Sequence, residues 1–303
     1  MKEILVAGSL NMDLVFSVDH QPVMGETVLS RGFSMSPGGK GANQAYAAGR
    51  LGGCVRMIGC VGNDVYGESL IANLQSVGVD TAAIARLDQV PTGIAGITVT
   101  ESGDNAIMVV SGANFCLTPE MIEKNKDMIC SADYVLTQLE TPVETVLALA
   151  KKAREAGKVM ILDPAPARTD LPEELFPLID ILKPNETELQ ILTGIQPDTD
   201  THIVQAAKVL IEKGVKTVVV TLGERGAMII DRENVQFIPA QRVDPVDTTA
   251  AGDTFTAAMA CGLAAGKDLT EAVRFANAAA SIVVTRKGAQ ISIPDIREIE
   301  QKS

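Results

Sequence analysis

Short apolar runs alternate with helical segments along most of the chain. The runs that predict buried strands are residues 4–7, 54–59, 134–139, 159–162, 179–182 and 217–220. Predicted helices end near residues 51, 77, 156 and 284. Strands and helices that alternate in this way pack as a mostly parallel sheet with right-handed crossovers. The pattern therefore predicts a fold of the α/β class.

Two stretches break this alternation. In residues 15–36, proline and glycine interrupt short apolar runs such as 27–29, and residues 93–110 hold two apolar runs around a polar turn. Both patterns are typical of hairpin strands. We expect these insertions, at about 14–36 and 91–111, to pair into a small β lid that excludes water from a substrate. A dimer surface is the alternative, and one sheet can serve both purposes.

The segment 247–255, Asp-Thr-Thr-Ala-Ala-Gly-Asp-Thr-Phe, opens a helix of small residues. Thr248 and Thr249 are predicted to cap this helix, and Gly252 lets another group approach the backbone. The free N–H groups and the dipole of a first helical turn form an anion site. Asp253 lies inside that turn, where a carboxylate can take the proton of a hydroxyl that attacks phosphorus. The segment predicts a phosphotransferase; the alternative is an aspartate that only stabilises the helix dipole.

Polar residues also follow the first strand. Asn11 and Asp13 lie in the predicted loop there, at the sheet edge where open α/β folds bind ligands, although both are common turn residues. Residues 37–45 form a glycine-rich turn before a helix, in which Lys40 and Asn43 offer hydrogen-bond donors. The chain has neither a Walker loop nor a G-x-G-x-x-G fingerprint, so this turn alone is a weak sign of phosphate binding.

Two later turns have both a structural and a functional interpretation. Asn185 and Glu188 are spaced as a helix capping box, and the same pair suits triphosphate oxygens and the hydration shell of Mg²⁺. Residues 223–226 form a glycine-bounded turn that either contacts a nucleotide or only connects two strands. Both alternatives stay open for each turn.

Composition limits the classes of function. The 303 residues are 46% hydrophobic and 21% charged, which suits a large globular core. Aromatic residues are only 3% and tryptophan is absent, so the core must be aliphatic and base-stacking platforms for single-stranded nucleic acid are disfavoured. The net charge of −12 repels nucleic acid and anionic membranes, whereas backbone amides and a metal ion can still hold ATP locally.

The cysteines and the first residues of the chain predict a cytoplasmic protein. Its five cysteines are scattered, without redox or zinc spacing, and are predicted to be reduced core residues. His20 and His202 lie in polar settings and are predicted to be on the surface. The first residues do not suit a signal peptide, and no apolar run is long enough to cross a bilayer.

Five segments together resemble the ribokinase-like family of carbohydrate kinases. They are residues 38–45 and 247–255, which are the most specific, and residues 138–140, 183–188 and 221–226. The resemblance covers essentially the whole chain, and the combination favours the catalytic interpretation of Asp253. Ala250 stands where many family members have glycine, and in this position the chain resembles the members that act on ribose.

The resemblance implies one α/β domain over residues 1–303. Its expected fold is a doubly wound, mostly parallel sheet flanked by helices, with a small β-sheet lid that is often shared across a homodimer. Its expected activity is ATP-dependent phosphorylation of D-ribose at the C5 hydroxyl. Mg²⁺ and a monovalent cation, K⁺, are the metal ions that it implies.

By position, the resemblance also implies the site residues. The expected sugar site is Asn11, Met12, Asp13, Gly39, Lys40, Gly41, Ala42, Asn43, Glu140 and Asp253. The expected catalytic groups are the Asp253 base and the backbone N–H groups of Ala250, Ala251 and Gly252. The expected site for ATP and Mg²⁺ is Asn185, Glu188, Thr221, Leu222, Gly223, Glu224, Arg225, Gly226, Gly252, Asp253 and Asn277. The expected monovalent cation site is Asp247, Thr249, Val283, Arg286, Gly288 and Ser292.

Other functions stay open at this point. The nearest alternative is a kinase for another small sugar, such as deoxyribose or fructose. A nucleoside kinase is less favoured, because a base pocket usually has aromatic rings and this chain has few. A non-catalytic sugar-binding sensor is an alternative of another class, which would bind ribose without releasing ADP.

Overall fold

The computed structural model describes residues 2–300, and its centre is a nine-stranded sheet. The strand order is β13-β12-β11-β10-β9-β8-β1-β4-β5. Neighbours from β11 to β5 are parallel, and β12 and β13 add an antiparallel hairpin at one edge. The strands are β1 (Glu3–Ala7), β4 (Cys54–Gly62), β5 (Asp80–Leu87), β8 (Tyr134–Thr137), β9 (Val159–Leu162), β10 (Ile181–Leu182), β11 (Thr217–Thr221), β12 (Gly226–Ile230) and β13 (Val235–Pro239). The predicted mostly parallel sheet is confirmed.

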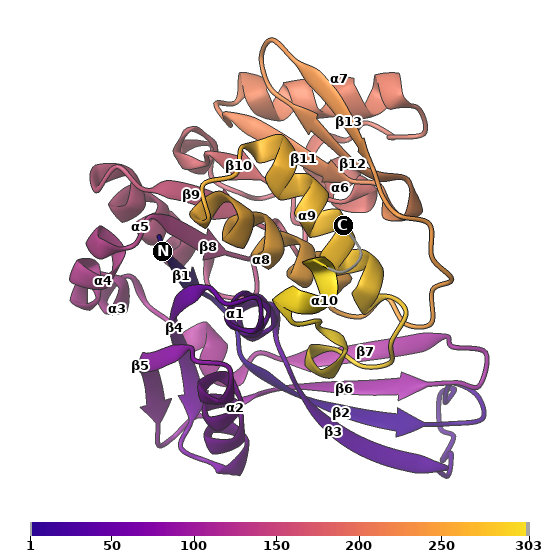
Figure 1. Cartoon of the computed structure of the whole chain (residues 1–303). Helices are drawn as coiled ribbons and strands as arrows, with labels where there is room; N and C mark the ends of the chain where they lie inside the picture. Colours follow the sequence, from indigo (N-terminus) through magenta and orange to yellow (C-terminus); the bar gives the residue numbers. More distant parts are fainter. Residues whose placement is uncertain (1, 301–303) are drawn as a thin grey trace.

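Helices cover both faces of this sheet (Figure 1). One face carries α1 (Lys40–Arg50), α2 (Val65–Ser76), α8 (Ala251–Ala264) and α9 (Leu269–Val283), with α10 (Ile296–Glu300) against α9. The other carries α3 (Pro119–Lys124), α4 (Lys126–Ser131), α5 (Val143–Glu155), α6 (Glu186–Thr193) and α7 (Asp200–Glu212). Short 3₁₀ turns are η1 (Gly112–Cys116), η2 (Glu173–Leu178), η3 (Gly223–Arg225) and η4 (Gln290–Ser292). The expected doubly wound arrangement is therefore present.

The two faces of the sheet each bury an aliphatic layer. Along β1, Ile4 and Val6 belong to the core on one face, and Leu5 and Ala7 belong to the core on the other. Successive side chains of a strand point to opposite faces, so a continuous apolar run is what a strand covered on both sides requires. The largest fully buried side chains are isoleucine, leucine and methionine, as the aromatic-poor composition predicts.

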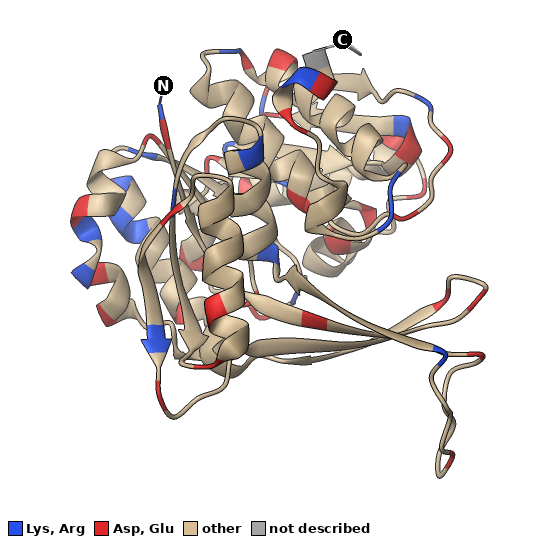
Figure 2. Ribbon diagram, turned by 60° about the horizontal axis from the view of Figure 1, so that its bottom comes forward, with Lys and Arg blue, Asp and Glu red and all other residues tan. Residues whose placement is uncertain are grey.

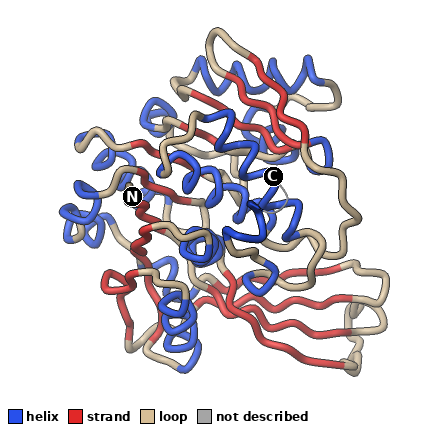
Figure 3. Tube along the Cα trace, viewed as in Figure 1, coloured by secondary structure: helices blue, strands red, loops and turns tan. Residues whose placement is uncertain are grey.

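A second, four-stranded sheet extends away from the layered body (Figures 1 and 3). It consists of β2 (Asn11–Ser17), β3 (Gly32–Gly38), β6 (Gly93–Val99) and β7 (Asn105–Val110), in the order β3-β2-β6-β7. Asp13 is the one charged residue within these strands, and the other acidic and basic residues nearby lie in the loops (Figure 2). This small sheet is the one that the two insertions predict.

Several local predictions were wrong at the start of this sheet. Asn11 and Asp13 lie in strand β2 and not in a loop, because the chain turns within the three residues after β1 and immediately enters the second sheet. Residues 27–29 are irregular and pair with no strand. Their exposed position gives an apolar run nothing to pack against, and Leu29 keeps 86% of its surface exposed.

The predicted threonine cap of α8 was also wrong. The N-cap residue is Ala250, in the left-handed region with φ 60°, and no side chain caps the helix. The hydroxyl of Thr249 instead donates to Oδ1 of Asp247 at 2.6 Å. A nearby carboxylate therefore takes the hydrogen bond that the sequence pattern assigned to the helix terminus.

The cysteine prediction was correct only in part. All five cysteines are free, but Cys60 and Cys261 are buried whereas Cys54 and Cys130 are exposed. The surface positions of His20 and His202 are confirmed by exposed contacts with Glu26 and Asp198. Among residues 2–300, no helix has both the length and the apolar character that a bilayer span requires.

Candidate active site

Three parallel strands place polar residues in one row at their carboxyl ends. The pairing of β8, β9 and β10 aligns the residues that follow them, Gln138, Asp163 and Lys183. All three are buried. The sequence analysis gave Asp163 and Lys183 no role, yet each is the first polar residue after a buried apolar run at the ligand-binding edge. That signal was sufficient to single them out.

Helix α8 begins beside this row. No side chain caps its first turn. The Ala251 N–H donates to the Thr248 carbonyl at 3.2 Å, whereas the N–H groups of Gly252 and Asp253 lie at the positions of a helix start that suit an anion. Apart from the adjacent residues and the backbone of α8 itself, the one atom of residues 2–300 that a Cβ placed on Gly252 would meet within 4 Å is Nζ of Lys183, at 3.5 Å. The backbone of Gly252 therefore borders open space with an ammonium group at its side.

Asp253 is buried in polar surroundings. Its Oδ2 accepts a hydrogen bond from Nδ2 of Asn43 at 2.9 Å, and its Oδ1 accepts one from Nε2 of Gln44 at 3.3 Å. Burial raises the pKa of Asp253, and the positive charge of Lys40 opposes that shift. A carboxylate that is oriented and made more basic in this way suits general-base chemistry.

A network of buried amides holds the two donors to Asp253 in place. Nε2 of Gln290 donates to Oδ1 of Asn43 at 3.0 Å, and Nε2 of Gln138 donates to Oε1 of Gln44 at 2.7 Å. Gln44 also donates to Oδ2 of Asp163 at 3.0 Å. The sequence analysis included Gln44 and Gln138 in its motif segments but gave no role to them or to Gln290, because a glutamine in a helix or loop has no pattern that distinguishes a buried partner from a solvated one.

The glycine-rich turn before α1 packs tightly against the turn after β1. A Cβ atom on Gly39 would lie 2.7 Å from the backbone N of Asn11, and one on Gly41 would lie 2.5 Å from that of Ser9. Only glycine fits at this distance. Oε2 of Glu140 accepts from Oγ of Ser9 at 2.5 Å and from the backbone N of Lys40 at 3.1 Å. The structure thus brings together residues from β1, α1 and the end of β8.

Three carboxylates and one ammonium group face the same region. Burial raises the pKa of Asp13 from 3.8 to about 7, and the charges of Glu140 and Asp253 add to the shift. The charge of Asp253, followed by those of other nearby carboxylates, raises the pKa of Lys40. Lys40 therefore stays protonated and offsets a concentration of negative charge.

Three of the expected sugar-site residues have side chains that are buried or already hydrogen-bonded within the protein. The side chains of Met12 and Ala42 are buried in the apolar core, which leaves only their backbone for a ligand. Asn11 is buried, and its Oδ1 accepts from Nδ2 of Asn114 at 2.7 Å. Asn114, which the sequence analysis missed, also bonds both backbone groups of Leu10 and so anchors the β1–β2 turn.

On the other side of the row, Asn185 and Glu188 form the capping box of α6. Oδ1 of Asn185 accepts from the Glu188 N–H at 2.7 Å, and Oε2 of Glu188 accepts from the Asn185 N–H at 2.8 Å. Burial raises the pKa of Glu188, whereas the charge of Lys183 lowers it. The structural interpretation of the spacing is confirmed, and Glu188 also lies within the electrostatic reach of the buried row.

The turn after β11 lies beside these residues. Thr221 forms a parallel bridge with Asn185, and the Leu222 N–H donates to the Gly226 carbonyl at 2.8 Å. The Leu222 side chain is buried in the core, so only its backbone can meet a ligand. Gly223 and Glu224 are exposed in η3, and Arg225 pairs with Asp200.

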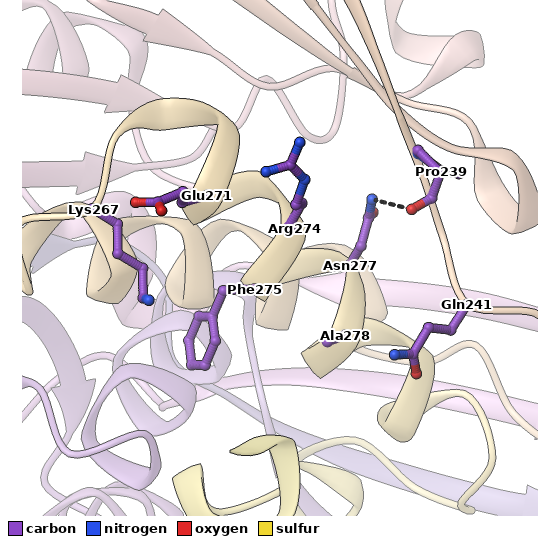
Figure 4. Close-up of a pocket in the computed structure, with 8 residues that line it drawn as sticks. All are labelled: Pro239, Gln241, Lys267, Glu271, Arg274, Phe275, Asn277 and Ala278. Atoms are coloured by element: carbon purple, nitrogen blue, oxygen red, sulfur yellow. Dashed lines mark hydrogen bonds between the residues drawn. The ribbon is translucent and has the colours of Figure 1, made fainter. Parts of the chain in front are cut away.

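Asn277 lies at a cavity between α9 and the end of β13 (Figure 4). Its Nδ2 donates to the Ile238 carbonyl at 3.1 Å and to the Pro239 carbonyl at 3.4 Å. The cavity has a volume of about 410 Å³ and is lined by Pro239, Gln241, Lys267, Glu271, Arg274, Phe275, Asn277 and Ala278. The Ala240 N–H bonds the Arg225 carbonyl, which connects this cavity to the turn after β11.

The expected monovalent cation site forms one compact loop cluster. Oδ2 of Asp247 accepts from the Gly288 N–H at 2.8 Å, and Oδ1 accepts from the Thr249 N–H at 2.9 Å. Nη1 of Arg286 donates to the Ser292 carbonyl at 3.4 Å, and the Val283 carbonyl accepts from the Arg286 N–H. The part of the chain that the structure describes has no cluster of three or more His, Cys, Asp or Glu suited to a metal ion.

A buried carboxylate at a helix N-terminus, surrounded by polar residues from β2, α1 and the ends of β8, β9 and β10, is typical of a phosphotransferase for small hydroxylated molecules. The model of the pfkB family of carbohydrate kinases matches residues 1–296. The chain belongs to this family, and it is an ATP-dependent sugar kinase.

Relatives of known activity match nearly the whole chain. A ribokinase of Haemophilus influenzae is 42% identical over 297 residues, which cover 98% of this chain and 97% of the relative. A deoxyribokinase of Salmonella typhi is 37% identical over 299 residues, covering 99% and 98%. The structure of Arabidopsis thaliana ribokinase complexed with ribose and ATP has a TM-score of 0.94 and 37% identity, covering 99% of this chain and 98% of that one.

The raised pKa of Asp13 predicts a pH-dependent gain of stability for Asp13→Asn. Because the folded pKa of about 7 exceeds the ordinary 3.8, ionisation of Asp13 destabilises the fold progressively from about pH 4 to pH 7. At 1.36 kcal/mol per pKa unit, removing the charge should raise the free energy of unfolding by up to about 4 kcal/mol at pH 8 and by less than half of that at pH 5. Urea unfolding at both pH values measures this.

The exposed Asp127→Asn is the matched control, and it should change stability little at either pH. An equal effect of Asp13→Asn at pH 5 and pH 8 contradicts the prediction.

Proposed function

We propose that the protein transfers the γ-phosphoryl group of ATP to O5 of D-ribose, which gives D-ribose 5-phosphate and ADP. The observation that carries this proposal is the Asp253 carboxylate, hydrogen-bonded by Asn43 and Gln44 at the uncapped start of α8. The ribokinases among the relatives support ribose as the sugar. The deoxyribokinase relative makes deoxyribose the second candidate.

In the proposed mechanism, the chain's own residues orient the sugar and move one proton. Asp13 and Glu140 accept hydrogen bonds from ribose hydroxyls, and Asn11 exchanges hydrogen bonds with them. Gly39, Gly41 and Asn43 close around the same sugar. Asp253 accepts the O5 proton as that oxygen attacks the γ-phosphorus in line, and ADP leaves. Backbone N–H groups from Ala250 to Asp253 stabilise the charge that builds on the transferring group.

The nucleotide would occupy the opposite side of the buried row. We assign its phosphates to Asn185, Glu188 and the start of α8, and its adenosine to the turn 221–226 and Asn277. The residues present suit a hydrated Mg²⁺, because Oδ1 of Asp163 is buried without a partner among the described residues and Glu188 lies in the same field. When bound, Mg²⁺ neutralises charge on the β and γ oxygens.

The four-stranded sheet is proposed to act as the lid of a single domain that spans residues 1–303. The lid would comprise the insertions at about 14–36 and 91–111 and would limit ATP hydrolysis by excluding water. Its apolar side chains Phe16, Phe33, Met35, Ile107, Met108, Val109 and Val110 are exposed by 36% to 71%. An exposed apolar area of this kind fits a second copy of the chain, so we propose a homodimer through the lid, in the cytoplasm.

A sugar panel tests the proposed substrate. In a coupled assay of ADP release, we expect D-ribose to give the highest kcat/KM, followed by deoxyribose, with fructose and adenosine far lower. Hydroxyl groups that meet built hydrogen-bond partners are discriminated strongly when one is missing. If another sugar gives the highest kcat/KM, that sugar takes the place of ribose in the proposal. If the protein binds ribose but releases no ADP, it is a sensor and not a kinase.

Substitution of Asp253 tests the proposed base. Asp253→Asn keeps the shape of the side chain and one of the two oxygens that accept from Asn43 and Gln44, but it removes the proton acceptor, so turnover should fall by at least about 10²- to 10⁴-fold. Ribose affinity, measured by calorimetry, should change far less. Turnover at the level of the wild-type protein or the Asp127→Asn control would reject the assignment.

The cluster around Asp247 is the proposed K⁺ site. Because Asp247 bonds the Thr249 and Gly288 backbone, an ion there would order the loop that precedes the anion site. We expect activity to rise with K⁺ and to rise less with Na⁺ at constant ionic strength. Equal rates in K⁺, in Na⁺ and in a large organic cation would show that the cluster is not a K⁺ site.

A further inference from the structure

Lys183 has no role in the assignments above, and it forms a buried ion pair with Asp163. Its side chain is 4% exposed, and its Nζ lies 2.9 Å from Oδ2 of Asp163, which is 2% exposed. Taking two charges out of water costs several kcal/mol per ion, and such pairs are weak contributors to stability. An ion pair of this kind at the ligand-binding edge of the sheet therefore suggests a role in the chemistry.

The position of Lys183 is the second observation. Outside α8 and the residues next to Gly252, Nζ of Lys183 is the one atom of the described chain within 4 Å of a Cβ placed on Gly252, at 3.5 Å. The ammonium group thus borders the same space as the first-turn N–H groups of α8. An anion held by those N–H groups lies within reach of Nζ.

Lys183 also lies between the two halves of the site. Burial raises the pKa of both Asp253 and Glu188, and the charge of Lys183 opposes the shift in each. Asp253 is on the acceptor side, and Glu188 is on the nucleotide side. The group that passes from the nucleotide to the acceptor has to cross the region that Lys183 faces.

We propose that Lys183 is a further catalytic residue, whose ammonium group donates a hydrogen bond to a non-bridging oxygen of the transferring phosphoryl group beside Gly252. Asp163 is a positioning residue that holds the ammonium group toward this space. Lys183 keeps its proton throughout, since the O5 proton goes to Asp253 and no bond to Lys183 forms or breaks. The proposal rests on the proposed function, because it requires phosphoryl transfer at this site.

Thr256 and Gln44 fix the other side of the pair. Oδ2 of Asp163 accepts from Oγ1 of Thr256 at 3.3 Å and from Nε2 of Gln44 at 3.0 Å. The carboxylate is therefore tied to α8 and to α1 at once, and its orientation does not depend on Lys183 alone. This arrangement allows Lys183 to be changed while the carboxylate's other contacts stay in place.

The test separates a catalytic ammonium group from a merely structural ion pair. The variants are Lys183→Met, Lys183→Arg, Asp163→Asn and the double variant Lys183→Met with Asp163→Asn. Removing one partner leaves an uncompensated buried charge, whereas the double variant removes the charges of both. The exposed pair Lys151 and Glu174, changed to Met and Gln, is the matched control.

We expect Lys183→Met to lower kcat by about 10²- to 10³-fold, the range found when one donor to a developing oxyanion is removed. The double variant should regain thermal stability and remain as slow as Lys183→Met. Lys183→Arg should be intermediate, because it keeps the charge with a different donor geometry. The control pair should stay within about twofold of the wild-type kcat.

Binding gives a readout that does not depend on turnover. With ribose present, Lys183→Met and the double variant should lose affinity for ADP with fluoroaluminate, a mimic of the transferring group, by a similar factor. Their affinity for ADP alone should change little.

Three results overturn the proposal: near-wild-type kcat in the double variant, near-wild-type kcat in Lys183→Met, or an equal loss of affinity for ADP and for its fluoroaluminate complex. The wild-type protein is assayed first with ribose, deoxyribose and fructose. If it phosphorylates none of them, the proposed function fails; if it phosphorylates one and the Lys183 variants keep full rate, only the role of Lys183 fails.

Discussion

Charge balance among buried groups at one end of the parallel sheet is the constraint on which the rest of the structure depends. The carboxylates of Asp13, Asp163 and Asp253 converge there, and burial raises the pKa of Asp13 and of Asp253. The ammonium groups of Lys40 and Lys183 oppose that shift at Asp253, and buried amides orient the oxygens of Asp163 and Asp253. The Asp253 carboxylate is therefore balanced by buried cations and amides rather than by bulk water.

The parallel sheet makes this balance possible because it directs many strand ends to one edge. Residues that are far apart in the sequence meet there. Asn43 lies 210 positions from Asp253 and 247 from Gln290, and the three side chains form one hydrogen-bonded chain. Helix α8 adds its N-terminus to the same edge, and no side chain caps its first turn. The amides that orient Asp253 and the helix N-terminus beside it therefore come from different elements that meet at one edge of the sheet.

Two close backbone contacts connect this edge to the small sheet. Gly39 and Gly41 approach the turn after β1 so closely that any side chain would clash. Strand β2 starts directly at that turn, so Asn11 and Asp13 belong to the small sheet and lie at its junction with the large one. The proposed lid and the proposed sugar site therefore share one strand.

The sequence by itself determined the α/β class, the parallel sheet and the small second sheet, because apolar periodicity and chain-breaking residues act locally. It also singled out Asp253, Lys40 and Glu140 by their motifs. Only the tertiary structure decided that Asp163 and Lys183 form a buried pair, that Gln44 and Gln290 orient the base, and that Ala250 rather than a threonine begins α8. These features depend on which strand ends become neighbours and on which polar groups lose water together, and no local pattern encodes either.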